Sequence, residues 1–232
     1  MPRVRQFAAQ QRDADNREAV AVNVLFDLDG TLTDPREGIV ACIRYALSTL
    51  GEPTPSDSNL ERFIGPPLRD AFGELLSKDL ARVEAAVAAY RERFVAVGMF
   101  ENIVYEGIPA VLESLVARDA RLFVATSKPK LFAERILDHF CIASYFSAIY
   151  GSELGGARSD KAELITYVLA RSRLDPSDTI MVGDRHHDVH GARRNRVIPV
   201  GVLWGYGSRE ELGLAGAERL LEEPYEVAQL VA

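Results

Sequence analysis

The 232-residue chain has little cysteine and only one tryptophan. Its two cysteines, Cys42 and Cys141, have no cysteine or histidine beside them at the spacing of a metal site, and two thiols are too few for a disulfide framework. We therefore expect two free, buried thiols in a reducing compartment. A disulfide scaffold and a cysteine nucleophile are both excluded.

Long hydrophobic runs are also missing. No apolar run approaches the ~20 residues that a membrane helix needs, and the first residues contain no apolar signal-peptide segment. Hydrophobic residues make up 47% and charged residues 26%, as in ordinary globular proteins. The net charge is −7 and no basic stripe is present, which disfavours a nucleic-acid polymer as partner. We expect a cytoplasmic protein with no membrane partner.

Residues 22–34 run an apolar segment directly into acidic residues: Val-Asn-Val-Leu-Phe-Asp-Leu-Asp-Gly-Thr-Leu-Thr-Asp. The pattern predicts a strand that ends at Asp27 and Asp29. Side chains two residues apart on a strand leave the same face, and Gly30 permits a bend after them. Two carboxylates this close suit Mg²⁺, which prefers oxygen ligands. Asp and Gly are also ordinary turn residues, so this stretch alone does not exclude an acidic turn.

Three further groups of polar residues lie next to apolar segments. The segment 122–125 precedes Thr126, Ser127 and Lys128; Lys161 begins the helical pattern of residues 161–170; and the segment 179–182 precedes Gly-Asp-Arg-His-His-Asp, which contains Asp184 and Asp188. The carboxyl ends of parallel strands meet at one edge of a sheet, where ligands bind in folds of this kind. We therefore expect these polar groups to lie close to Asp27.

The order of the predicted elements indicates an α/β fold with an all-helical insertion. Helical patterns cover residues 37–50, 68–76 and 80–97, with no strong strand candidate between residues 35 and 102. Helices are then expected at 108–118, 131–139, 161–170 and 189–195, alternating with strands at 122–125, 148–150, 179–182 and 197–203. Such alternation predicts a doubly wound parallel, Rossmann-like sheet with helices on both faces.

These patterns divide the chain into three parts. Residues 1–19 are polar, with few large apolar side chains, and are expected to form a flexible tail. Residues 20–34 and 106–232 are expected to form the core domain, and residues 35–105 a separate helical cap domain. The cap should move relative to the core about linkers near residues 34–35 and 98–102, because only two chain crossings restrain it.

The sequence Asp-x-Asp-Gly-Thr, the hydroxyl of Thr126, Lys161 and the sequence Gly-Asp-x-x-x-Asp together resemble the haloacid dehalogenase (HAD) superfamily of phosphoryl-transfer enzymes. The resemblance covers about residues 20–232. The segments Phe-Ile-Gly-Pro-Pro-Leu, Ala-Thr-Ser-Lys-Pro and Gly-Asp-Arg-His-His-Asp-Val-His-Gly-Ala look like its phosphoglycolate phosphatase and 5′-nucleotidase-like branch. The resemblance implies a Rossmann-like core with a helical C1-type cap, a Mg²⁺ cofactor and hydrolysis of a small phosphomonoester through an aspartyl-phosphate.

The resemblance also implies roles for individual residues. Asp27 corresponds to the nucleophile and Asp29 to the general acid and base. Thr126 corresponds to a hydroxyl that donates to a phosphate oxygen, with the Ser127 backbone N–H close by. Lys161 corresponds to the cation that stabilises the phosphoryl group, and Lys128 is the second candidate for that role.

The implied Mg²⁺ ligands are Asp27, the main-chain carbonyl of Asp29, Asp184 and Asp188. Asp188 would bind the metal through water or hold Lys161. His186 and His187 lie between the last two carboxylates, but imidazole is softer than the oxygen ligands that Mg²⁺ prefers. We expect these two histidines to be exposed at a helix N-terminus.

Arg44 and Arg69 are the candidate substrate contacts of the cap, and a solvated role is equally consistent with the sequence.

Three functions other than a phosphatase are considered. A HAD phosphotransferase that acts as a protein-tyrosine kinase on a protein substrate would share every residue named above. Haloalkanoate dehalogenation needs neither Asp29 nor Mg²⁺, so the intact motifs disfavour it. A non-catalytic binding module predicts the loss of at least one motif residue, and none is lost.

Overall fold

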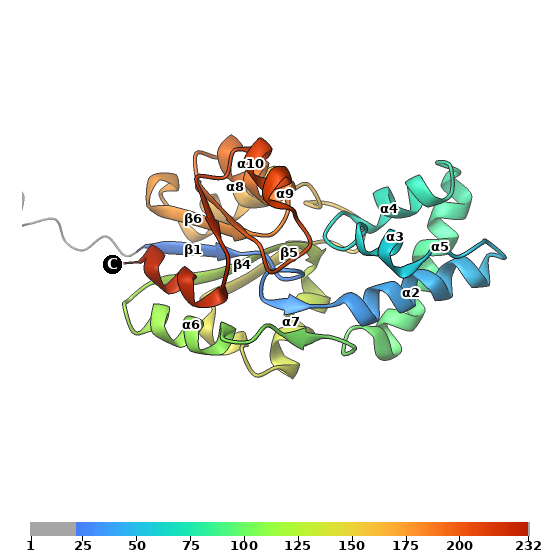
Figure 1. Ribbon diagram of the computed structural model, residues 1–232, viewed down its shortest axis with the longest axis horizontal. Coiled ribbons are helices and arrows are strands. Elements are labelled where there is room, and N and C mark those ends of the chain that lie inside the picture. Colours follow the sequence, from blue (N-terminus) through green and yellow to red (C-terminus); the bar gives the residue numbers. More distant parts are fainter. Residues whose placement is uncertain (1–21, 232) are drawn as a thin grey trace, which may run out of the picture.

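The centre of the fold is a six-stranded parallel sheet (Figure 1), seen in a computed structural model that describes residues 22–231. The predicted tail, residues 1–19, lies outside the described residues. The strand order is β5-β4-β1-β6-β7-β8, so the first strand lies in the middle of the sheet. The strands are β1 (Asn23–Phe26), β4 (Arg121–Pro129), β5 (Ala148–Ser152), β6 (Thr179–Gly183), β7 (Ile198–Val202) and β8 (Arg219–Leu221).

Helices cover both faces of this sheet, as predicted for a doubly wound fold. One face packs against α6 (Ile108–Val116), α7 (Lys130–His139) and η4 (Pro224–Leu230); the other packs against α8 (Lys161–Ser172) and α9 (His186–Arg194), with α10 (Arg209–Ala215) on α9. In Figure 1, α8, α9 and α10 lie above the sheet and α6 lies below it. Short 3₁₀ turns, η2 (Ala143–Tyr145) and η3 (Pro176–Asp178), precede β5 and β6.

The apolar run of β1 explains its central place. Val24 and Phe26 point into the core on the α6 and α7 side, and Leu25 points into the core on the α8 side. All three side chains are fully buried. Because successive strand side chains alternate between faces, a strand covered on both sides must be apolar at every position. The predicted fold class, a doubly wound parallel sheet, is confirmed.

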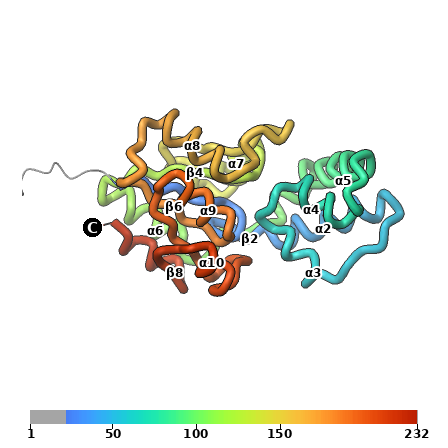
Figure 2. Tube along the Cα trace, turned by 90° about the horizontal axis from the view of Figure 1, so that it is seen from above, coloured from blue at the N-terminus to red at the C-terminus, as the bar shows by residue number. Residues whose placement is uncertain are grey.

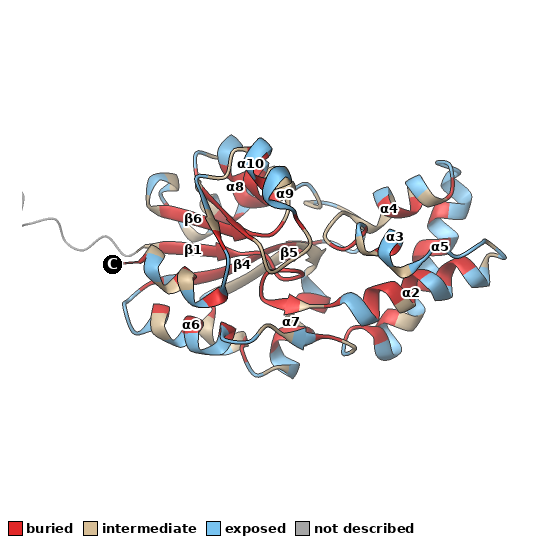
Figure 3. Ribbon diagram, in the orientation of Figure 1, coloured by how far each residue is buried: buried red, intermediate tan, exposed pale blue. Residues whose placement is uncertain are grey.

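Residues 35–105, the helical insert, lie beyond the carboxyl ends of the strands (Figures 1 and 2). The insert contains α2 (Arg36–Thr49), α3 (Asp57–Glu61), α4 (Leu68–Leu75), α5 (Leu80–Arg93) and the π-helical turn η1 (Phe94–Gly98). Helix α5 packs against both α2 and α4, and the rings of Phe72 and Tyr90 meet edge to face at 6.2 Å. Figure 3 shows buried residues inside the insert as well as around the sheet.

A short antiparallel ribbon joins the two ends of the insert. The ribbon consists of β2 (Thr33–Asp34) and β3 (Ile103–Val104), and Tyr105 N donates to Leu32 O over 3.1 Å. Gly38 N, at the start of α2, also donates to Glu101 O over 3.0 Å. The two crossings therefore lie side by side and are hydrogen-bonded to each other where the sequence predicts two linkers. The division into core and cap domains stays a proposal.

Several boundaries differ from the predicted ones. Helix α5 ends at Arg93 and continues as the wider turn η1, where the sequence predicts one helix to residue 97. Strand β4 continues past Ala125 to Pro129 through a register shift against β5. Helix α9 begins at His186 rather than residue 189. The short elements α3, α10 and β8 are too brief to produce a clear period in the sequence.

The expectation of two buried free thiols is confirmed for one cysteine only. Cys42 is a buried free thiol, whereas Cys141 is exposed, so the prediction is wrong for Cys141. Cys141 follows the end of α7, and its φ of 56° lies in the left-handed region. Among residues 22–231, no helix is long and apolar enough to cross a membrane.

Candidate active site

The predicted polar residues converge at one edge of the sheet. Asp27 and Asp29 follow β1, Asp184 follows β6, and Thr126 lies near the end of β4. Asp27 N donates to Val182 O over 2.9 Å, which continues the pairing of the two central strands up to the first carboxylate. Parallel pairing of β1 with β4 and β6 therefore brings residues almost 160 positions apart to the same place.

Lys161, the first residue of α8, connects two of the carboxylates. Its Nζ lies 3.0 Å from Asp27 Oδ1 and 2.7 Å from Asp188 Oδ1, and donates to Ala125 O over 2.9 Å. The Lys161 side chain is buried, which lowers the pKa of its amine, but the carboxylates of Asp188 and Asp27 outweigh burial and raise that pKa overall. Lys161 is therefore a fixed positive charge at Asp27.

Three carboxylates form an acidic cluster. One oxygen each from Asp27, Asp184 and Asp188 lie within 4.8 Å of one another, and all three residues are buried. Burial, with repulsion from Asp188 and Asp27, raises the pKa of Asp184 well above its usual range, and burial raises the pKa of Asp188 to about 6. Buried carboxylates that repel one another fit a hard divalent cation held by oxygen ligands, and Mg²⁺ is such a cation.

Asp29 lies beside this cluster with its side chain paired to a different cation. Asp29 Oδ2 is 2.7 Å from Lys128 Nζ, while Asp29 Oδ1 is buried and accepts no hydrogen bond from the described residues. Burial raises the pKa of Asp29, although Lys128 acts against that shift. The two candidate lysines thus have separate partners: Lys161 contacts Asp27, and Lys128 contacts Asp29.

Hydroxyl groups hold the last residues of β4, where its pairing with β5 shifts register. Lys128 N donates to the Thr126 hydroxyl over 3.3 Å. The Ser127 hydroxyl donates to Ser159 O over 3.1 Å, and the Ser152 hydroxyl donates to Ser127 O over 2.7 Å. Thr126 is buried near the end of β4. Its direct role stays a prediction.

The loop after β7 also contacts these residues, although it was not among the predicted site segments. Tyr206 N donates to Asp184 Oδ2 over 2.8 Å, and Trp204 Nε1 donates to Thr31 O over 3.0 Å. Gly30 lies against the same carboxylate: its φ is 83°, and a Cβ there would lie 2.2 Å from Asp184 Oδ2. The sequence Trp-Gly-Tyr-Gly directly after an apolar strand was the available signal.

The two histidines are half-buried, so the expectation of exposed side chains is wrong. They lie in the first turn of α9, which packs against β6 and β7. His186 Nδ1 lies 2.7 Å from Glu211 Oε1, and burial lowers the pKa of His187 to about 4. Neither histidine is in the acidic cluster.

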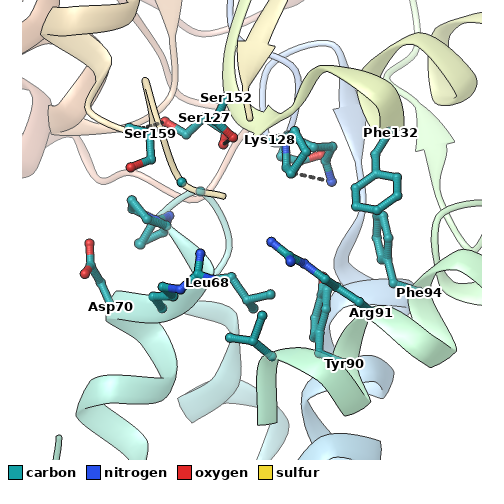
Figure 4. Close-up of a pocket in the computed structure, with 18 of the residues that line it drawn as sticks. Leu68, Asp70, Tyr90, Arg91, Phe94, Ser127, Lys128, Phe132, Ser152 and Ser159 are labelled. Carbon is teal, nitrogen blue, oxygen red and sulfur yellow. Dashed lines mark hydrogen bonds and ion pairs between the residues drawn. The ribbon is translucent and has the colours of Figure 1, made fainter. Parts of the chain in front are cut away.

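A cavity of about 350 Å³ extends from Asp29 and Lys128 to the helical insert (Figure 4). Tyr90 and Phe94 from the insert and Phe132 from α7 line one side, and Ser127, Ser152 and Ser159 lie on another. The loop of residues 63–69, the expected Gly-Pro-Pro turn, lines the cavity as well. A substrate held at Asp29 would therefore contact both the sheet edge and the insert.

Only one of the two predicted cap arginines lines this cavity. Arg69 does so, with its Nε and Nη2 donating to Glu84 at 2.6 and 3.0 Å. Arg44 instead pairs with Asp57 on the exposed surface of the insert and is not among the cavity residues. The structure places Arg91, which the sequence did not single out, in the cavity instead.

The parallel sheet, with a buried acidic cluster and a lysine at its strand ends, is typical of an α/β enzyme. Residues 24–202 match the model of the haloacid dehalogenase-like hydrolase family, and the chain belongs to that family. The predicted enzyme class, a HAD-family hydrolase with phosphatase relatives, is confirmed.

Named relatives agree with this family. The chain is 52% identical over 190 residues to a 5′-nucleotidase of Pseudomonas aeruginosa, covering 82% of this chain and 86% of that protein. It is 41% identical over 184 residues to the tyrosine-protein kinase PtkA of Mycobacterium tuberculosis, covering 79% of this chain and 62% of that protein. The crystal structure of a predicted phosphatase from Clostridium acetobutylicum superposes with a TM-score of 0.88 at 44% identity, covering 91% of this chain and 98% of that one.

Proposed function

We propose that the chain is a Mg²⁺-dependent phosphatase that hydrolyses a small phosphomonoester, either a nucleotide 5′-monophosphate or a compound similar to phosphoglycolate. The observation that carries the proposal is the convergence of Asp27, Lys161 and the two further carboxylates of the acidic cluster at one buried strand edge. The named 5′-nucleotidase and phosphatase relatives support the same reaction class.

In the proposed reaction, an Asp27 carboxylate oxygen attacks phosphorus and the bond from phosphorus to the leaving oxygen breaks. Asp29 gives its proton to that oxygen. The aspartyl-phosphate is then attacked by water, whose proton Asp29 accepts, and the bond to Asp27 breaks to release inorganic phosphate. The raised pKa of Asp29 suits a group that must hold a proton before the first step.

Charge stabilisation is the main contribution of the remaining residues. Lys161 contacts Asp27 and would stabilise the charge that develops on the phosphoryl group, to which the Thr126 hydroxyl would donate. Asp27, Asp184 and Asp188, with the Asp29 carbonyl, would hold Mg²⁺, which neutralises the charge of the phosphoryl oxygens when bound. A cytoplasmic location stays part of this proposal.

The second candidate is a phosphotransferase that modifies tyrosine in a protein, and the PtkA relative is the observation that favours it. Both activities would use the same Asp27. A non-catalytic binding module has no such support, since every motif residue is present at the site.

One paired assay tests these proposals. A panel of phosphomonoesters is incubated with the protein, with and without Mg²⁺, beside an ATP assay that measures label transferred to protein. Release of phosphate from small esters only with Mg²⁺ is the expected result. Stable transfer from ATP to tyrosine without ester hydrolysis would favour the kinase, and inactivity in both assays would favour a binding module.

A further inference from the structure

Among the described residues, the cavity holds three cations, and only one lacks a carboxylate partner. Lys128 is paired with Asp29, and Arg69 is paired through two hydrogen bonds with Glu84. Arg91 Nη2 donates to the main-chain carbonyl of Leu154 over 2.8 Å, and no carboxylate lies in ion-pair range of it. The Arg91 guanidinium thus retains an unneutralised charge and further N–H donors.

Arg91 is also directed at the cavity. In Figure 4 its side chain extends from α5 toward the middle of the space, across from Lys128. Burial and the nearby Arg69 lower the pKa of Arg91, and Glu84 acts more weakly in the opposite direction. Because an arginine has only donors, a group that satisfies it must offer oxygen or nitrogen acceptors.

The wall next to Arg91 is aromatic. The Tyr90 and Phe94 rings stack at 5.5 Å with 18° between their planes, and the Phe94 and Phe132 rings meet at 5.3 Å. Lys128 Nζ lies 4.8 Å from the centre of the Phe94 ring, so the aromatic wall reaches from the reaction centre to Arg91. An aromatic wall with a cation at its end suits a planar ring that carries acceptors on its edge.

The volume supports a ring rather than a two-carbon acid. The cavity of about 350 Å³ falls in the range of small-molecule sites, roughly 300–1,000 Å³. A leaving group of two carbons would leave the aromatic wall without contact.

We propose that Arg91 is a specificity-determining residue and that it donates to a carbonyl oxygen on a planar ring of the leaving group, as in a keto nucleobase. This inference rests on the proposed phosphatase function and names its substrate class. The phosphoryl group would lie at Asp27 and Asp29, the ring along Tyr90 and Phe94, and the carbonyl oxygen at Arg91.

The test compares four esters with the full chain and Mg²⁺: inosine 5′-monophosphate, adenosine 5′-monophosphate, ribose 5-phosphate and 2-phosphoglycolate. The inosine and adenosine esters differ where inosine has a carbonyl oxygen and adenosine an amino group. Ribose 5-phosphate lacks the ring. The variants are Arg91→Ala, Arg91→Lys and the control Arg82→Ala, which removes an arginine of the same helix that pairs with Glu52 outside the cavity.

The wild type should hydrolyse the inosine ester best, by about tenfold in kcat/KM over the adenosine ester. Arg91→Ala should lower kcat/KM for the inosine ester about 10- to 100-fold, since a hydrogen bond to a charged group is lost, and change ribose 5-phosphate less than about twofold. Arg91→Lys should have a kcat/KM for the inosine ester between those of the wild type and Arg91→Ala, because lysine keeps the charge but lacks the planar guanidinium. Arg82→Ala should match the wild type.

An equal loss on all four esters would make Arg91 a structural residue and overturn the proposal. A dependence on Arg91 confined to 2-phosphoglycolate would overturn the planar-ring class. The absence of Mg²⁺-dependent phosphate release from every ester is a separate result, which would remove the proposed phosphatase function and this inference with it.

Discussion

Charged side chains form buried pairs at the strand ends and exposed pairs in the helical insert. The Lys161–Asp27 pair is almost completely buried, with exposed side-chain fractions of 3% and 7%, whereas those of the Arg44–Asp57 pair are 48% and 42%. A buried pair keeps its geometry because breaking it leaves a charge without solvent, while an exposed pair contributes little and rearranges easily. The pair at the strand ends is therefore held in one geometry, and exposed pairs on the surface of the insert can change at little cost in stability.

The largest expected loss of activity comes from replacing a single carboxylate at the strand ends. Asp27→Asn should lower phosphate release below about a hundredth of the wild-type rate, because the covalent route needs this nucleophile. Circular dichroism and thermal melting should show an intact fold. Asp57→Asn, which removes an exposed carboxylate of the insert, is the matched control and should keep nearly full activity. An active Asp27→Asn protein would contradict the proposed role of Asp27.

Metal removal should act on the strand ends alone. EDTA is expected to stop turnover, and excess Mg²⁺ to restore it, because the acidic cluster of three buried carboxylates lacks a compensating divalent charge without the metal. Asp184→Asn should raise the Mg²⁺ concentration needed for half-maximal activity. Full activity in EDTA would exclude the metal-dependent mechanism.

Removing one cation from each region should reduce the free energy of unfolding by different amounts. Lys161→Met should lower the free energy of unfolding by about 3–5 kcal/mol, since it leaves Asp27 and Asp188 buried without their partner. Arg82→Ala removes the exposed pair with Glu52 and should cost less than about 1 kcal/mol. Urea unfolding of both variants measures these changes in the free energy of unfolding. Equal changes would contradict the expected difference between the buried and the exposed pair.

The smallest effects are expected from the two arginines predicted to contact substrate. Arg69 lines the cavity and Arg44 does not, so Arg69→Ala should alter kcat/KM for the best substrate by a few-fold, about 3–10 times. Arg44→Ala should do the same only if the insert closes further over the substrate. Kinetics on the best substrate and on a generic aryl phosphate distinguish these cases, because the aryl ester needs only the residues at the strand ends.

The sequence predicted the strand ends well because their pattern is local. An apolar run followed by a carboxylate indicates both the strand and its carboxyl end, and parallel pairing then brings Asp27 and Asp184 together. The contacts of the insert could not be predicted in this way. Whether Arg44, Arg69 or Arg91 reaches the cavity depends on how α2, α4 and α5 pack, and on which arginine finds a carboxylate partner. Neither is encoded in a short motif.

Arg185 links the loop after β6, which carries Asp184 of the acidic cluster, directly to the insert. It follows Asp184, and its Nη1 donates to Ile64 O over 2.7 Å, in the loop that lines the cavity, while its Nε lies 3.0 Å from Glu211 Oε1. Gly65 lies against this side chain with a φ of 100°. If Arg185 couples the two binding sites, each ligand must change the affinity for the other by the same factor. A ligand that draws the insert inward should therefore tighten Mg²⁺ binding by the same factor by which Mg²⁺ tightens that ligand.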